Sequence, residues 1–87
     1  MDDLSKIREK ISSIDHDLIS LLSERLKMAE DIAVYKKCNN LPIYQPDRET
    51  QMLLHYRKLA SVKNIDPDFI ENIFNLIIRE MRKNQSS

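Results

Sequence analysis

The 87-residue chain contains no glycine, and this absence removes most of the folds open to a small protein. The tight hairpin turns that join antiparallel strands rely on glycine, so an all-β fold and a doubly wound α/β fold are close to excluded. Phosphate-cradling loops and dinucleotide-binding fingerprints need glycine where the backbone approaches the ligand, and they are excluded with it. The length allows one domain at most. The sequence therefore predicts a single all-α domain over residues 1–87.

An uninterrupted helical pattern runs through the first 38 residues. Apolar residues recur at positions 4, 7, 11, 14, 18, 21, 28, 32 and 35, mostly at alternating spacings of three and four. Acidic Asp2 and Asp3 at the start and lysines at the end both match the helix dipole. Asn39 and Asn40 are the expected stop, because asparagine replaces glycine in left-handed C-caps. The pattern predicts one helix over about residues 4–38.

Two shorter helices are predicted after a linker. Residues 41–45 are expected to be extended, because Pro42 and Pro46 each disfavour helix in the residue before them. Pro46 suits the first turn of a second helix, which we expect over about residues 46–62. Asp66-Pro67-Asp68 is a strong start signal for a third helix over about residues 67–84. We expect this helix to bury its apolar face, which consists of Phe69, Ile70, Ile73, Phe74, Ile77 and Ile78.

The first predicted helix is too long for a compact monomer. Thirty-five residues extend roughly 52 Å as an α-helix, whereas a globule of this chain length is roughly 30 Å across. The apolar stripe continues along the overhang, and a soluble monomer rarely exposes so much contiguous apolar surface. We therefore predict a homodimer in which the long helices interlock in a two-fold arrangement. The alternative is a helix that breaks and folds back, but residues 15–30 contain neither glycine nor proline.

Several polar residues lie inside the apolar stripes: Arg8, Arg25 and Lys36 in the first helix, Glu49 in the second and Gln85 in the third. Any one of them alone is best explained as a stripe-edge residue whose stem packs while its polar head reaches water. Every predicted helix carries at least one, however, and burying them unpaired costs on the order of several kcal/mol each. Facing helices of a bundle can bring such groups together. The set favours a site for an anionic ligand with carboxylate and hydroxyl or ether oxygens.

The spacing along the first helix sharpens this prediction. Arg25 and Lys36 are three turns apart, roughly 16 Å between Cα atoms, so their long side chains can bracket a ligand of one small ring. Arg8 lies roughly 25 Å from Arg25 along the same helix and cannot reach that ligand. In an antiparallel dimer Arg8 would enter the partner's site. The predicted dimer and the predicted site thus support each other.

Charge and cysteine content restrict partners and compartment. Fourteen basic and fourteen acidic residues give no net charge, so nucleic acid is not an expected partner. No apolar run approaches the roughly 18 residues that a bilayer requires, so no membrane is expected either. Cys38 is the single cysteine and no signal peptide is evident, which indicates the cytoplasm. His16 and His55 have no cysteine or carboxylate at ligand spacing, so neither a metal nor another cofactor is predicted.

The joint spacing of the motif residues is more specific than any one motif. These residues are Arg8-Glu9-Lys10-Ile11, Ile14-Asp15, Leu21-Leu22-Ser23-Glu24-Arg25, Lys36, Pro42-Ile43-Tyr44, Pro46-Asp47-Arg48-Glu49, Ile77-Ile78 and Gln85. Over essentially the whole chain they resemble the all-helical chorismate mutases. The resemblance implies three helices per chain in an intertwined dimer with two sites. It also implies conversion of chorismate to prephenate in the biosynthesis of phenylalanine and tyrosine.

The resemblance further implies a role for each matching residue. Arg25 and, from the other subunit, Arg8 would pair with the two substrate carboxylates. Lys36 and Gln85 would donate hydrogen bonds toward the ether oxygen of the breaking C–O bond. Glu49 would accept a hydrogen bond from the ring hydroxyl.

Three further positions complete the implied site. Arg48 would support the carboxylate side of the pocket. Gln45 stands where an aspartate is common in the family, and Met81 stands where a hydroxyl residue is common. The first contact can survive through the backbone, whereas Met81 cannot donate a hydrogen bond, so the resemblance does not carry over the carboxylate contact at that position.

The reaction needs no nucleophile, because a Claisen rearrangement is concerted and unimolecular. It needs the folded diaxial conformer of the substrate and stabilisation of the negative charge that grows on the ether oxygen. Three alternatives stay open: an isochorismate-pyruvate lyase of the same fold, a non-catalytic helical dimerisation module, and a domain of a fused polypeptide. The start at Met1 and the polar end at Ser87 favour a free-standing protein over the third.

Overall fold

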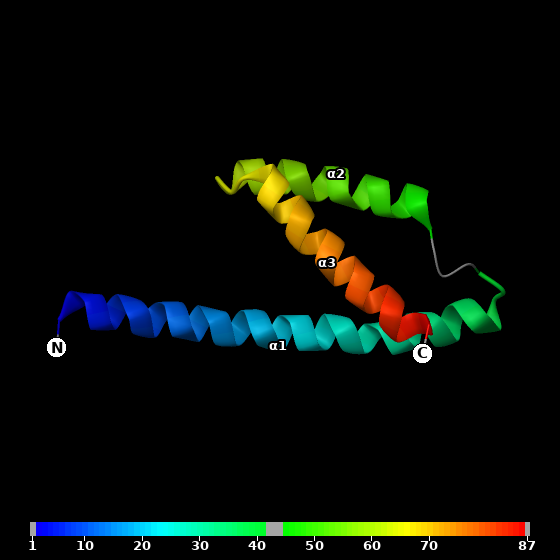
Figure 1. Cartoon of the computed structure of the whole chain (residues 1–87), viewed down its shortest axis with the longest axis horizontal. Helices are drawn as coiled ribbons and strands as arrows, with labels where there is room; N and C mark the ends of the chain where they lie inside the picture. Colours follow the sequence, from blue (N-terminus) through cyan, green and yellow to red (C-terminus); the bar gives the residue numbers. More distant parts are fainter. Residues whose placement is uncertain (1, 42–44, 87) are drawn as a thin grey trace.

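The computed structural model of the chain consists of three helices (Figure 1). It describes residues 2–41 and 45–86, with side chains as far as Lys83. Helix α1 spans Asp3–Cys38, α2 spans Pro46–Val62 and α3 spans Pro67–Ser86, and no strand occurs in the described ranges. The all-α prediction is confirmed. The helix bounds lie within two residues of those expected, while the linker prediction for residues 42–44 falls outside the described residues.

Aspartate side chains cap the starts of α1 and α3. The Asp2 carboxylate accepts a hydrogen bond of 2.7 Å from the backbone N–H of Ser5. This bond lowers the pKa of Asp2, because the ionised carboxylate is the better acceptor. At α3 the Asp66 carboxylate accepts from the N–H of Asp68 at 3.0 Å, and Pro67 occupies the first helical position. The predicted start signal of the third helix is thereby confirmed.

Asparagine ends α1 and α2 in the conformation that glycine usually supplies. Asn40 has φ 55° and Asn64 has φ 61°. Beyond Asn40, the N–H of Leu41 donates to the carbonyl of Lys36 at 2.8 Å, and an equivalent bond of 2.8 Å follows Asn64. These bonds satisfy carbonyls that the helix end would leave open. A chain without glycine thus still turns sharply twice.

Helix α3 packs against both of the other helices and crosses obliquely between them (Figure 1). Arg57 of α2 pairs with Asp68 at 2.8 Å and with Glu71 at 3.5 Å, both on α3. The Asp68 carboxylate raises the pKa of Arg57. The rings of Tyr56 and Phe74 lie 4.7 Å apart between their centroids. Ion pairs and aromatic contact therefore hold α2 and α3 together as a hairpin.

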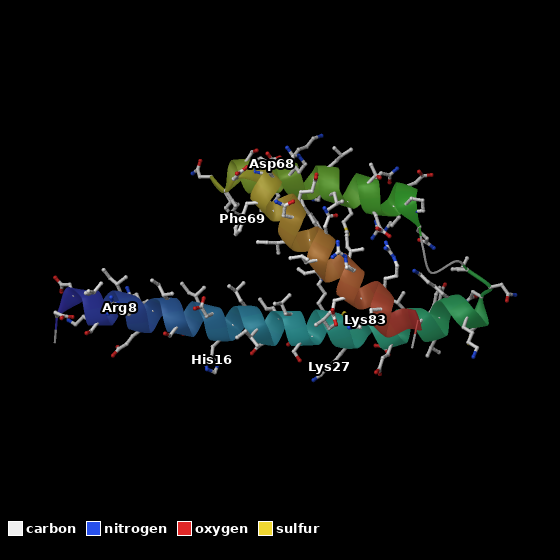
Figure 2. All side chains as sticks on the ribbon, viewed as in Figure 1. Arg8, His16, Lys27, Asp68, Phe69 and Lys83 are labelled. Atoms are coloured by element: carbon white, nitrogen blue, oxygen red, sulfur yellow. The ribbon has the colours of Figure 1, made fainter. Side chains whose placement is uncertain are left out.

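Among the side chains that the structure describes, each helix has one buried residue, and these mark the small core: Ala29 on α1, Ala60 on α2 and Met81 on α3. Small side chains at the first two positions allow close approach of the helices. Phe69, which the sequence predicted to be buried, is 56% exposed in the single chain. It lies in the first turn of α3, at the end of that helix that is far from α1 (Figure 2). The expectation of burial is therefore wrong for Phe69 in the single chain, and the other five residues of that face are only half-buried.

The N-terminal half of α1 extends beyond the other two helices, and the chain measures 57 × 25 × 15 Å (Figure 1). Helix α1 is continuous, so the alternative in which it breaks and folds back is wrong. Six apolar residues that recur three or four positions apart along this part of the helix are each more than half exposed: Leu4, Ile7, Ile11, Ile14, Leu18 and Leu21. We call them the α1 stripe. None of the helices described is long and apolar enough to cross a bilayer.

Candidate functional site

A cavity of about 260 Å³ lies where α1, the start of α2 and the end of α3 come together. Six of the eight residues that the sequence singled out line it: Arg25, Lys36, Gln45, Arg48, Glu49 and Met81. They come from all three helices and from the residue that precedes α2. Helix periodicity explains part of this convergence, because residues three turns apart on α1 share one face. The other residues converge because α3 packs obliquely against both α1 and α2.

Arg25 is oriented by two contacts from α3. Its guanidinium Nη1 donates a hydrogen bond to the thioether sulfur of Met81. Its Cζ atom lies 5.8 Å from the centre of the Phe74 ring, in the range of a cation–π interaction. The side chain is half-buried, so the charge is partly withdrawn from water and directed toward the cavity that it lines. A half-buried cation acts more strongly on a bound anion than one in bulk water.

Glu49, in the first turn of α2, is bound by an arginine from α3. Nη2 of Arg82 lies 2.7 Å from Oε1 and 2.6 Å from Oε2 of the carboxylate. The Glu49 side chain is 25% exposed and that of Arg82 is 37% exposed. This pairing offsets the one carboxylate that lines the cavity among the described residues. A carboxylate beside an anionic ligand would otherwise repel it, and the cation of Arg82 offsets that repulsion.

Four residues that line the cavity were missed by the sequence analysis: Ile32, Met52, Ile78 and Arg82. The three apolar ones carry no polar group, so helical periodicity alone assigns them to packing between helices. Arg82 belongs to the group of basic residues near the end of α3, where the helix dipole already explains a positive charge. Its signal was available, because Arg82 lies four residues after Ile78 on α3, while Glu49, inside an apolar stripe, requires a cation.

The cavity is strongly positive. Four cationic side chains, Arg25, Lys36, Arg48 and Arg82, and the single carboxylate of Glu49 line it among the residues described, which leaves three net positive charges. A concave surface of one sign focuses the field and attracts ligands of the opposite charge. The volume suits a compact molecule. The arrangement therefore favours a small ligand with two negative charges.

Two predicted site residues are not placed in this cavity by the single chain. Arg8 is exposed and lies near the N-terminal end of α1, whereas α3 meets α1 at the other end, near Lys83 (Figure 2). Its predicted contact with ligand therefore needs a second copy of the chain. The side chain of Gln85 lies outside the described residues, although its backbone belongs to α3.

The rest of the described chain offers little other chemistry. Across residues 2–41 and 45–86, no three side chains among His, Cys, Asp and Glu form a group that could hold a metal ion. Cys38 is a free and exposed thiol at the end of α1. The cationic cavity is therefore the candidate active site.

Comparison with known proteins identifies the family to which the sequence of this chain is similar. Residues 7–86 match the family described as chorismate mutase type II. A T-protein of Enterobacter agglomerans is 37% identical over 78 residues, which cover 90% of this chain and 21% of the relative. A chorismate mutase of Methanocaldococcus jannaschii is 36% identical over 75 residues, which cover 86% of this chain and 76% of the relative.

A bifunctional chorismate mutase/prephenate dehydratase of Escherichia coli K12 is 34% identical over 77 residues, covering 88% of this chain and 20% of the relative. The chain thus spans about a fifth of the length of the T-protein and of the bifunctional protein. The family match covers nearly all of this chain and includes every residue of α2 and α3. The chain belongs to the chorismate mutase type II family.

Proposed function

We propose that this chain catalyses the rearrangement of chorismate to prephenate, the committed step toward phenylalanine and tyrosine. One observation carries the proposal: Arg25, Lys36 and Glu49 line a single cationic cavity although they come from two helices. Their types match the two carboxylates, the ether oxygen and the ring hydroxyl of chorismate. The family membership of the chain supports the same reaction.

In the proposed mechanism the protein acts by shape and charge, with no covalent intermediate. Arg25 and Arg8 from the other subunit hold the two carboxylate groups, Arg48 supports the carboxylate side of the pocket, and together they select the folded diaxial conformer of the substrate. Lys36, assisted by Gln85, donates toward the ether oxygen, on which negative charge grows as the C–O bond breaks. Preorganised donors of this kind stabilise the transition state more than the ground state. Glu49 accepts from the ring hydroxyl and thereby fixes the orientation of the ring.

The proposed active form is an intertwined homodimer. The α1 stripe is exposed over several turns, and covering it with a second copy removes a large apolar area from water. A second apolar hollow of about 280 Å³, lined mainly by the α2–α3 hairpin, offers further surface for a partner. In an antiparallel arrangement Arg8 of one chain approaches the cavity of the other. Each site then holds cations from both chains.

The two departures from the family pattern do not remove the cationic cavity. Gln45 lines it as a neutral amide. Met81 donates no hydrogen bond, but its sulfur accepts one from Arg25, so it contributes to the site by orienting a cation. We also place the protein in the cytoplasm, which a free and exposed Cys38 supports because that compartment keeps thiols reduced.

A turnover assay on chorismate, with sedimentation of the same sample, tests the proposal. We expect loss of the diene absorbance, no release of pyruvate, and a particle of two chains. A parallel assay with isochorismate detects the lyase alternative through pyruvate release. A stable dimer without turnover of either substrate would instead identify a dimerisation module. Either result would replace the proposed function.

A further inference from the structure

The Arg82–Glu49 pair joins the end of α3 to the first turn of α2 inside the cavity. Both carboxylate oxygens lie within 2.7 Å of the same guanidinium nitrogen. The adjacent residue, Met81, bonds Arg25 of α1. Two consecutive residues of α3 therefore orient one cation and one anion of the site. This arrangement depends on the side chain at position 82 and not on the matching motif residues alone.

In the proposed chemistry the negative charge of Glu49 has one favourable and one unfavourable effect, and Arg82 offsets the unfavourable one. An ionised carboxylate accepts a hydrogen bond from the ring hydroxyl without donating one, so ionisation fixes its role. The same charge repels the two carboxylates of the substrate in a cavity only partly open to water. Arg82 offsets that repulsion at close range. The other charged groups that face Glu49 are Arg25 and Lys36 from α1 and Arg48 from α2.

We propose that Arg82 is a positioning residue, which holds the Glu49 carboxylate toward the ring hydroxyl of the substrate and offsets its charge. The inference rests on the proposed function. One cationic nitrogen of Arg82 bonds both carboxylate oxygens, and these charge-assisted bonds hold the Glu49 side chain of α2 against α3. Arg82 therefore acts through Glu49. Removing Arg82 should therefore cost much less activity once Glu49 is replaced by glutamine, which a merely structural role would not predict.

The test compares kcat/KM for chorismate in the wild type, Arg82→Met, Glu49→Gln and the double variant. We expect Arg82→Met to lower kcat/KM about tenfold near neutral pH, within the range of coupling between bonded residues. In the Glu49→Gln background, where the carboxylate that Arg82 holds is absent, Arg82→Met should cost less than about threefold. Arg82→Lys should recover most of the rate.

Arg79→Met is the matched control, because Arg79 is exposed on the same helix and does not line the cavity. Circular dichroism checks that each variant folds; if Arg82→Met does not, Arg82→Gln replaces it, since it removes the charge but keeps a polar group. Equal losses in both Glu49 backgrounds would overturn the role of Arg82 while leaving the proposed function intact. A wild type that does not turn over chorismate would overturn both.

Discussion

Met81 of α3 accepts a hydrogen bond through its thioether sulfur from the guanidinium of Arg25 on α1. Met81 is buried, with 8% of its surface exposed, and it lines the cavity. The position thus combines packing between two helices with the orientation of a charged group. A hydroxyl side chain there would favour contact with the ligand at the expense of that packing.

We expect Met81→Ser to lower the stability of the fold while it strengthens the binding of chorismate. Loss of a buried side chain of this size lowers the free energy of unfolding by about 2–4 kcal/mol. The new hydroxyl can donate to a substrate carboxylate, so KM for chorismate should fall. Thermal melting and steady-state kinetics measure the two effects. Met81→Leu is the control, since it preserves volume and costs less than about 1.5 kcal/mol. A KM that rises in the serine variant alone would contradict the expected contact between the hydroxyl and the substrate.

Replacing Lys36 or Arg25 by alanine should lower kcat/KM for chorismate and leave the assembly of the dimer unchanged. Each removes a cation that we assign to substrate charge, and loss of one preorganised donor lowers the rate on the order of a hundredfold or more. The measurement is kcat/KM with sedimentation of each variant. Lys37→Ala is the control, because Lys37 is exposed and does not line the cavity. Near-wild-type turnover in either cavity variant would remove the role assigned to that residue.

The local features of the fold could be predicted because each depends on a few neighbouring residues. The stop at Asn40 and the cap by Asp66 are such features, and the structure shows both. Arg25 and Lys36 could be assigned to one site because helix geometry fixes their common face. The Arg82–Glu49 pair could not be predicted in this way, since it depends on where the end of α3 meets the start of α2. The exposure of Phe69 likewise depends on the oblique crossing of α3, which leaves the start of that helix far from α1.

A charge placed on the α1 stripe should disrupt the proposed dimer. Ile14 is 58% exposed in the single chain, so Ile14→Glu is nearly neutral for a monomer. In a dimer the same change buries an unpaired carboxylate, which is strongly unfavourable. We expect a monomer by sedimentation and loss of turnover. Ser13→Glu, one residue away and exposed, is the control; an unchanged sedimentation coefficient for Ile14→Glu would exclude the stripe from the interface.

The first turn of α1 should lose stability in acid through Asp2. Its pKa is lowered from 3.8 by the bond from Ser5, so the ionised cap stabilises the helix above pH 3.8 and that contribution disappears as pH falls through the lowered pKa. Asp2→Asn keeps a capping group that does not titrate. We expect amide protection at Ser5 to fall with pH in the wild type and to stay level in the variant. Asp17→Asn, away from the helix ends, serves as control; equal profiles would contradict this assignment.

Mixing two inactive variants tests whether each site is shared between chains. Arg8→Ala and Arg25→Ala should each be poorly active, because each removes a cation from both sites of a homodimer. In a heterodimer, the chain that keeps Arg25 receives Arg8 from its partner, while the other site lacks both. Random exchange of subunits should therefore restore about a quarter of wild-type turnover, since half of the dimers then hold one complete site. Mixing Arg25→Ala with Lys36→Ala is the control: both residues line the cavity of their own chain, so no complete site forms and no recovery is expected. Absence of recovery in the first mixture, with exchange verified by mass spectrometry, would rule out Arg8 as a residue supplied across the interface.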